Sequence, residues 1–270
     1  MKVFLCAISL VALPLALAGC GNKNPTNTVQ QSGPPADGLK ELIKDDVVVG
    51  KPTPFNPGMK PVEAGDTVWV TYTGTFKDGR VFDTNEKSQK PDAKPYQVLV
   101  GAGTVIQGWD QGLVGMLPGG VRKLSVPWKL GYKEAGSPPK IPPYTDLYFE
   151  IKLHDCAKPG EETTYGIHDI KKGTGAVVGP KSTCTVHTTV REVDGKVIDD
   201  TKTMGQKKPA TFTIGKEQTL PSIEDAVQGM RVGGIRDIQL PPAIAFPPSS
   251  ETGISGTMMY YVRVELLAVK

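Results

Sequence analysis

One part of this 270-residue chain contains a set of aromatic residues together with one aspartate and two aliphatic residues. The set comprises Tyr72, Phe82, Asp83, Tyr96, Val105, Ile106, Trp109, Tyr132 and Phe149. Aromatic residues at strand spacing usually fill a hydrophobic core, and that is one interpretation of the set. Its three tyrosine hydroxyls would need hydrogen-bond partners in a core, however, and apolar walls with a few polar groups also suit a binding pocket.

Other residue patterns that carry chemistry are missing from the sequence. The chain has three histidines without metal-ligand spacing, which are His154, His168 and His187. His154 and Cys156 flank Asp155, and we attribute that pairing to chance rather than to a nucleophile and its base. The string GAGTVIQG at 101–108 lacks both the lysine of a P-loop and the spacing of a dinucleotide fingerprint. We therefore expect neither a metal nor a cofactor.

The composition is that of an ordinary globular protein, with 39% hydrophobic and 22% charged residues. The 31 basic and 28 acidic side chains nearly balance, which argues against a protein that binds duplex nucleic acid. Glycine (31) and proline (24) are frequent, which favours short strands and loops over long helices. The length suggests two domains or one large one.

The first twenty residues, MKVFLCAISLVALPLALAGC, indicate an exported protein. Lys2 precedes an apolar run that is short and contains Pro14, which suits a secretory signal better than a membrane span. The end of the run resembles a bacterial lipobox, so we expect residues 1–19 to be removed and Cys20 to be lipidated. An ordinary signal with a chance cysteine is the alternative. Because Gly21 rather than aspartate follows, we expect a lipid anchor in the bacterial cell envelope, at the outer membrane.

The segment that follows the signal, residues 20–37, is polar and contains prolines, so it is expected to be a flexible tether. Two cysteines remain in the rest of the chain. An exported compartment permits a disulfide between Cys156 and Cys184. Cys184 alternates with Val186 in a presumed core strand, however, which favours buried free thiols.

The remainder of the chain contains one pattern twice, at offsets of 114 to 116 residues. The recurring anchors are Asp78-Gly79 and Asp194-Gly195, Gly101 and Gly215, and Arg122 and Arg236. Strands are expected at 68–74 and 184–190, each followed by an Asp-Gly turn. The offset is that of a whole domain, so we expect two α+β domains, at 38–156 and 157–270, made mostly of short antiparallel strands.

Each copy also predicts one short helix. Apolar residues spaced 3, 4 and 3 apart lie on one helical face in both copies, and they are Ile106, Trp109, Leu113 and Met116, then Leu220, Ile223, Val227 and Met230. Gly108, Gly112 and Gly115 would each cost about 1 kcal/mol in a helix, which suggests close packing against a sheet. The first helix is expected to end at Pro118.

Six ordered strings of the first copy resemble the FKBP-type peptidyl-prolyl cis-trans isomerases. They are VTYTG (70–74), DGRVFDT (78–84), VIQGWDQGL (105–113), GGVRKLSVP (119–127), LGYK (130–133) and IPPYTDLYFEIKL (141–153). The resemblance implies two FKBP-like domains, each a curved antiparallel β-sheet wrapped around one short helix. It implies catalysis of proline isomerisation by the first domain, with X-Pro segments of exported proteins as substrates and macrolide inhibitors as further ligands.

The same resemblance implies roles for the residues of the set. Trp109 would be the floor of a proline pocket, and Asp83 and Tyr132 the polar groups of its rim. The walls would be Tyr72, Phe82, Tyr96, Val105, Ile106 and Phe149. Tyr132 and the backbone N–H of Ile106 would donate hydrogen bonds to substrate carbonyls, and Ile141 would belong to the loop over the pocket.

The sequence also departs from the family pattern. In the first copy Thr104, Lys133 and Lys140 replace the usual residues, and the segment 84–95 is about four residues longer than in minimal members. These changes bear on substrate preference and macrolide affinity. The second copy keeps Asp199 but replaces the pocket aromatics by Thr188, Ile198, Ile223 and Val262, and it has Phe246 at the place of the rim tyrosine. We therefore expect a weak or inactive second site.

Three functions follow as hypotheses. The first is a lipid-anchored prolyl isomerase that assists the folding of exported proteins. The second is a non-catalytic scaffold lipoprotein that holds Pro-containing segments in its groove, and the third is a purely structural surface lipoprotein. The presence of Asp83, Trp109 and Tyr132 together favours the first.

Overall fold

Antiparallel β-strands make up most of the regular secondary structure of the protein. The structure is a computed structural model, and it describes residues 33–55, 57–91, 93–161, 164–245 and 258–270. The predicted signal at 1–19, Cys20 and most of the predicted tether lie outside the described residues. Residues 33–270 form one compact unit that contains two six-stranded sheets. Within the described part, no helix combines the length and the apolar character needed to cross a membrane.

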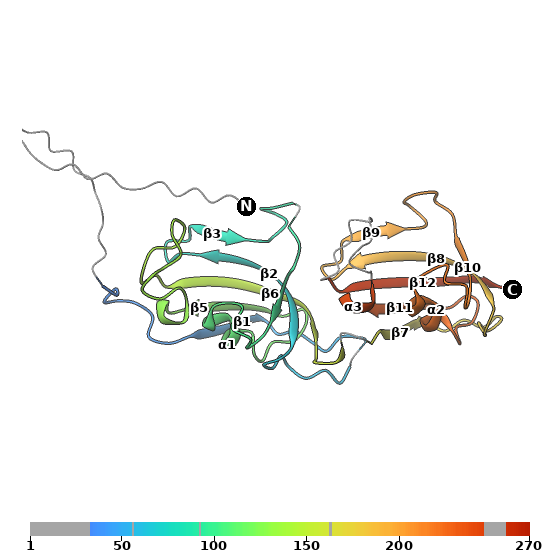
Figure 1. The fold of residues 1–270 in the computed structure, drawn as a ribbon, viewed down its shortest axis with the longest axis horizontal. Helices are drawn as coiled ribbons and strands as arrows, with labels where there is room; N and C mark the ends of the chain where they lie inside the picture. The colour runs from blue at the N-terminus through green and yellow to red at the C-terminus, as the bar shows by residue number, and fades with distance from the viewer. Residues whose placement is uncertain (1–32, 56, 92, 162–163, 246–257) are drawn as a thin grey trace, which may run out of the picture. The chain divides into compact units, whose positions relative to one another are not determined.

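The first sheet has the strand order β1-β5-β6-β2-β3, and β4 also pairs with β2 (Figure 1). Its strands are β1 (Ile43–Val48), β2 (Thr67–Thr75), β3 (Val81–Thr84), β4 (Tyr96–Leu99), β5 (Val121–Val126) and β6 (Leu147–Ala157). The helix α1 (Gln107–Gly112) lies beside β5, and one 3-10 turn spans Trp128–Leu130. All of the pairs in this sheet are antiparallel.

The second sheet repeats this topology, with the order β7-β11-β12-β8 and both β9 and β10 paired to β8. Its strands are β7 (Gly166–Lys171), β8 (Thr183–Glu192), β9 (Val197–Asp200), β10 (Ala210–Thr213), β11 (Ile235–Leu240) and β12 (Tyr260–Val269). The helix α2 (Pro221–Val227) lies beside β11, and a one-turn helix α3 (Pro242–Ala245) follows β11. The internal repeat of the sequence is therefore a repeat of the fold.

The alternation expected in the last strand of each copy is confirmed. Four alternate residues of β6 and four of β12 are buried in the cores, namely Leu147, Phe149, Ile151 and Leu153, and Tyr260, Val262, Val264 and Leu266. Successive side chains of a strand point to opposite faces, so one face of each strand carries the whole apolar set. The α+β class follows from such sheets, each packed against a short helix.

Glycines allow α1 to approach the first sheet closely. A Cβ atom on Gly108 would lie 2.3 Å from Cγ1 of Val126, and one on Gly112 would lie 2.4 Å from Cδ1 of Leu124. Real side chains do not come that close, so larger residues at these positions would push the helix off β5. The close packing inferred from the glycine content of this segment is confirmed.

The first helix is shorter than the apolar spacing predicts. It ends at Gly112, and Gly115 adopts a φ of +91°, which reverses the chain before the predicted end at Pro118. The backbone N–H of Gly115 donates to the carbonyl of Val62, and the N–H of Val62 donates to the carbonyl of Met116. Met116 is still buried, because the loop itself, rather than another helical turn, places it in the core.

Candidate functional site

One cavity of about 350 Å³ in the first copy is lined by nine residues that the sequence singles out. Thr104 lines the cavity as well. The full lining is Tyr72, Phe82, Asp83, Tyr96, Thr104, Val105, Ile106, Trp109, Tyr132 and Phe149. Strands β2, β3, β4 and β6, the helix α1 and two loops each contribute at least one side chain. The fold thus brings together residues that are as much as 77 positions apart, from Tyr72 to Phe149.

The aromatic rings of this cavity stand edge to face. The ring of Trp109 lies 4.9 Å from that of Tyr72 and 5.4 Å from that of Phe149, at interplanar angles of 87° and 84°. Phe82 meets Phe149 in the same way at 5.6 Å and 87°. Such T-shaped contacts are favourable between ring quadrupoles and hold each ring in one orientation. Trp109 is only 4% exposed and its indole N–H has no partner among the described residues.

The polar groups of the cavity centre on Asp83. The hydroxyl of Tyr72 donates a hydrogen bond of 2.6 Å to Oδ2 of Asp83. Tyr132, which also lines the cavity, is 39% exposed. Within the described part of the chain, the backbone N–H of Ile106 donates to no carbonyl, which leaves it available to a ligand. Apolar walls with a few directed polar groups are the usual make-up of a small binding site.

The loop that leads into α1 is fixed by a residue that the sequence analysis did not single out. The two carboxylate oxygens of Asp110 accept hydrogen bonds from the backbone N–H groups of Gly101, at 2.8 Å, and Gly103, at 3.1 Å. This places Thr104, Val105 and Ile106 against the cavity. An acidic residue in the first turn of the helix, directly after Trp109, was the available signal.

Ile141, in contrast, is absent from the lining of the cavity. Its side chain is buried in the core of the first copy, and its backbone carbonyl accepts a hydrogen bond from the N–H of Ser137. Lys133, beside the rim tyrosine, adopts a φ of +56°. Glycine reaches this left-handed region without strain, which gives a physical reason for the glycine that is usual at this position in the family.

His154 and Cys156 form no nucleophilic pair. The Nε2 atom of His154 lies 3.1 Å from the hydroxyl of Thr71, and burial lowers the pKa of this histidine to about 4. The Sγ atom of Cys156 lies 3.6 Å from the carboxylate of Asp66, and burial raises the pKa of the thiol well above its usual range. A protonated thiol is a poor nucleophile.

Cys156 and Cys184 are both buried and free, as the strand position of Cys184 suggested. No group of three or more histidine, cysteine, aspartate or glutamate side chains in the described ranges is placed to hold a metal ion.

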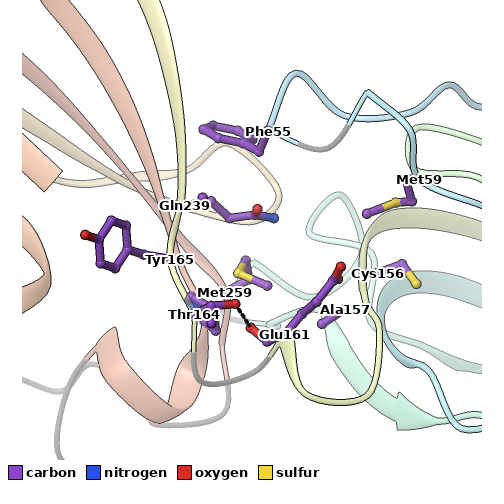
Figure 2. Close-up of a pocket in the computed structure, with 11 residues that line it drawn as sticks. Phe55, Met59, Cys156, Ala157, Glu161, Thr164, Tyr165, Gln239 and Met259 are labelled. Atoms are coloured by element: carbon purple, nitrogen blue, oxygen red, sulfur yellow. Dashed lines mark hydrogen bonds between the residues drawn. The ribbon is translucent and has the colours of Figure 1, made fainter.

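Three other hollows larger than 100 Å³ among the described residues lack the aromatic set. One of about 420 Å³ lies against β2, β5 and β6 and is lined mainly by polar side chains such as Thr73, Lys123 and Glu150. Another, of about 380 Å³, lies beside Lys171 and Arg231. Figure 2 shows the third, a cavity of about 180 Å³ with residues of both copies around it. Volume does not separate these from the aromatic cavity, but only the latter combines apolar walls with the Tyr72–Asp83 pair.

Comparison with known proteins accounts for this arrangement. A family model described as FKBP-type peptidyl-prolyl cis-trans isomerase matches residues 58–154 and, a second time, residues 175–267. The chain belongs to this family. The resemblance carried by the sequence strings is confirmed, and so is the presence of two FKBP domains.

The similar proteins include FKBPs of animals and plants. Human peptidyl-prolyl cis-trans isomerase FKBP10 is 31% identical over 185 residues, covering 68% of this chain and 31% of that protein. Mouse FKBP2 is 48% identical over 89 residues, covering 33% of this chain and 61% of that protein. The crystal structure of the three FKBP domains of wheat FKBP73 covers 85% of this chain and 94% of that chain, with 19% identity and a TM-score of 0.38. The chain thus spans less than two thirds of either curated relative's length.

The described residues of the second FKBP domain do not repeat the aromatic site. At the positions of Trp109 and Phe149 it has Ile223 and Val262, both buried in its core. Asp199 remains in the short strand β9, but Thr188 stands where a tyrosine would reach it. The counterpart of the rim tyrosine, Phe246, and the following loop at 247–256 lie outside the described residues.

The FKBP pocket is expected to be insensitive to pH between about pH 6 and about pH 9. Burial, followed by the hydrogen bond and charge of Asp83, raises the pKa of Tyr72 far above its usual range. Burial and the charges of Asp83 and Tyr96 also raise the pKa of Tyr132. Both hydroxyls therefore keep their protons across this range. A pH profile of kcat/KM checks this, and a fall near pH 8 that Tyr132→Phe abolishes would contradict it.

The same shifts set the direction of the change in stability at high pH. The folded state keeps tyrosine protons that the unfolded chain loses above about pH 10. The free energy of unfolding should therefore decrease as the pH rises beyond that value. Denaturant titrations at pH 9 and pH 11 measure the difference.

Proposed function

We propose that this FKBP is a peptidyl-prolyl cis-trans isomerase whose catalytic site is the aromatic cavity of its first domain. The observation that carries the proposal is the cavity itself, with Trp109 and Phe149 as apolar walls and the Tyr72–Asp83 hydrogen bond beside them. Substrates would be X-Pro segments of proteins, bound with the proline ring against Trp109.

The reaction needs no nucleophile. The planar amide resists rotation by roughly 18–20 kcal/mol because its C–N bond has double-bond character. The cis and trans isomers of an X-Pro bond differ by only about 1 kcal/mol, but they exchange over tens of seconds or longer. A catalyst therefore has to stabilise the twisted transition state relative to both planar forms.

The cavity offers two means of doing so. In the twisted amide the resonance is lost and the carbonyl is less polar, so an apolar site with little water disfavours the planar, charge-separated ground state. Donors at the rim orient the substrate, and we assign this role to the hydroxyl of Tyr132 and the backbone N–H of Ile106. Asp83 holds the hydroxyl of Tyr72 and so fixes the wall between them.

An isomerisation assay on the full chain tests the proposal, with short peptides that contain one X-Pro bond. Faster cis-to-trans conversion, proportional to enzyme concentration, is the expected result. A folded protein without isomerase activity that binds the same peptides would favour the non-catalytic scaffold instead. Full-chain variants suit the assignment to one domain better than isolated halves do, because Trp69 of β2 packs within the core cluster of the second domain.

We also propose that the protein is lipid-anchored through Cys20 in a bacterial cell envelope, where it would act on exported proteins. The support is the signal-like run before Cys20 and the polar segment after it. Changing Cys20 to alanine is expected to move the protein from the membrane fraction to the soluble fraction of the expressing cell. If the Cys20→Ala protein still sediments with membranes while an unmodified control does the same, the lipid anchor is contradicted.

A further inference from the structure

The segment that joins β3 to β4 in the first domain contacts two carboxylates of the second domain. The Nζ atom of Lys87 lies 2.5 Å from Oδ2 of Asp194 and 3.8 Å from Oε2 of Glu192. The Nζ atom of Lys94 lies 3.8 Å from Oε1 of the same glutamate. The carboxylate side chains of Asp194 and Glu192 are only 8% and 4% exposed, whereas the side chains of Lys87 and Lys94 are 32% and 42% exposed. We call these four residues the lysine clamp.

The segment held by the clamp connects two walls of the isomerase cavity. Lys87 follows Asp83 by four residues, and Lys94 precedes Tyr96 by two. Asn85, which is buried, links the ends of the segment to β2: its amide nitrogen donates to the carbonyls of Val70 and Lys94, at 3.1 Å and 3.0 Å. Its amide oxygen accepts from the backbone N–H of Tyr72 at 2.6 Å. A shift of either lysine would therefore be passed to residues that line the cavity.

The turn that carries the two carboxylates is itself fixed. Val193, between Glu192 and Asp194, is buried in a hydrophobic cluster that also contains Trp69 of the first domain. In the same turn, the backbone N–H of Lys196 donates a hydrogen bond to the carboxylate of Asp194. The acceptors of the clamp are thus held by apolar packing and by the hairpin between β8 and β9.

A second set of contacts holds the same two domains together. The carboxylate of Asp155 at the end of β6 accepts hydrogen bonds from the amide of Gln239, at 2.7 Å, and from the hydroxyl of Tyr261. Figure 2 shows Cys156 and Met59 of the first domain and Gln239 and Met259 of the second around the cavity beside these contacts. The clamp therefore does not have to join the domains, and its specific consequence is for the segment at 85–95.

The charges of the clamp favour contact between its two lysines and its two carboxylates. Burial would raise the pKa of Asp194, but the hydrogen bond from Lys87, that of the Lys196 N–H and the charge of Lys87 hold it below its usual value. The Oε2 atom of Glu192 has no hydrogen-bond partner among the described residues and is compensated by the lysine charges alone. Buried carboxylates are costly without a nearby cation, so the second domain has a strong preference for the bound position of both lysines.

We propose that Glu192 and Asp194 of the second domain are positioning residues for the isomerase site of the first: they hold Lys87 and Lys94, and with them the segment between Asp83 and Tyr96. This rests on the proposed function. It gives the second domain a part in the reaction without a site of its own. Loosening the segment should disturb the wall against which substrate binds, so KM is expected to rise about threefold to tenfold with a smaller change in kcat.

A double-mutant cycle in the full chain tests the clamp, with Lys87→Ala, Asp194→Ala and the double variant assayed for isomerisation. Both single variants should raise KM, and the double variant should raise it no further than the single ones, because each removes the same contact. Lys87→Arg keeps the charge and is expected to retain the KM of the wild type. A matched control is Lys77→Ala, which breaks the ion pair with Asp37 in which both side chains are largely exposed, and it should change nothing.

The outcomes separate the clamp from the proposed function. An inactive wild-type chain would overturn the proposed function. An active wild type in which Lys87→Ala leaves KM unchanged, or in which the two single effects add, would overturn the clamp alone. If Lys87→Arg raises KM as much as Lys87→Ala does, the lysine acts by shape rather than by charge, and the positioning role assigned to the carboxylates is also overturned.

Discussion

Replacing Asp83 by leucine is expected to lower kcat/KM for prolyl isomerisation about tenfold to a hundredfold. The carboxylate accepts the 2.6 Å hydrogen bond of the Tyr72 hydroxyl, and leucine would leave that half-buried hydroxyl without an acceptor. A hydrogen bond to a charged group contributes about 1.5–3 kcal/mol, which corresponds to this range of rates. The measurement is an isomerisation assay on the full chain, with circular dichroism to verify the fold.

The repeat supplies a matched control for this change. Asp199 occupies the corresponding position of the second domain, where Thr188 replaces the tyrosine. Asp199→Leu is expected to leave kcat/KM unchanged. A large loss of activity in Asp199→Leu together with wild-type activity in Asp83→Leu would place the catalytic site in the second domain and overturn the assignment.

Replacing Phe149 by alanine is expected to reduce both activity and stability. Its ring touches three others, those of Tyr72, Phe82 and Trp109, and it is only 6% exposed. Truncating a buried phenylalanine costs about 3–5 kcal/mol because it leaves a cavity. The lost apolar wall should also lower kcat/KM about tenfold or more, since burying a large apolar side chain contributes about 1.5–3 kcal/mol.

Two measurements separate these effects. The far-UV circular dichroism of Phe149→Ala should match that of the wild type, while its midpoint in urea falls. Val262→Ala removes the corresponding wall residue of the second domain, so it should lower stability but leave kcat/KM unchanged. Wild-type activity in folded Phe149→Ala would mean that the pocket is wrongly assigned.

The elements of the fold were largely predictable from local patterns. The alternating residues of β6 and β12, and the Asp-Gly turns that precede β3 and β9, are short-range signals that strand geometry imposes. The helix ends were less predictable. Met116 keeps helical spacing but is buried by a loop, because Gly115 turns the chain back toward Val62. A one-dimensional pattern records that a residue is buried, not which backbone conformation buries it.

The site shows the same division. The sequence strings contain eight of the ten residues that line the cavity, and the resemblance added Tyr96, because family motifs retain the residue types at such a site. They also assigned Ile141 to it, whereas the structure places this side chain in the core of the first domain. Asp110 was overlooked although it adjoins Trp109, since nothing in the sequence indicates that its carboxylate turns back to Gly101 and Gly103.

The sequence by itself left two interpretations of the aromatic set, a hydrophobic core or a binding pocket. Residue types and their order determined the family, the duplication and the loss of aromatic residues from the second copy. Only the tertiary structure decided that Tyr72 faces Asp83, and that Lys87 and Lys94 reach Asp194 and Glu192. The physical reason is that these contacts join residues from 11 to about a hundred positions apart, and their strength depends on burial that folding alone creates.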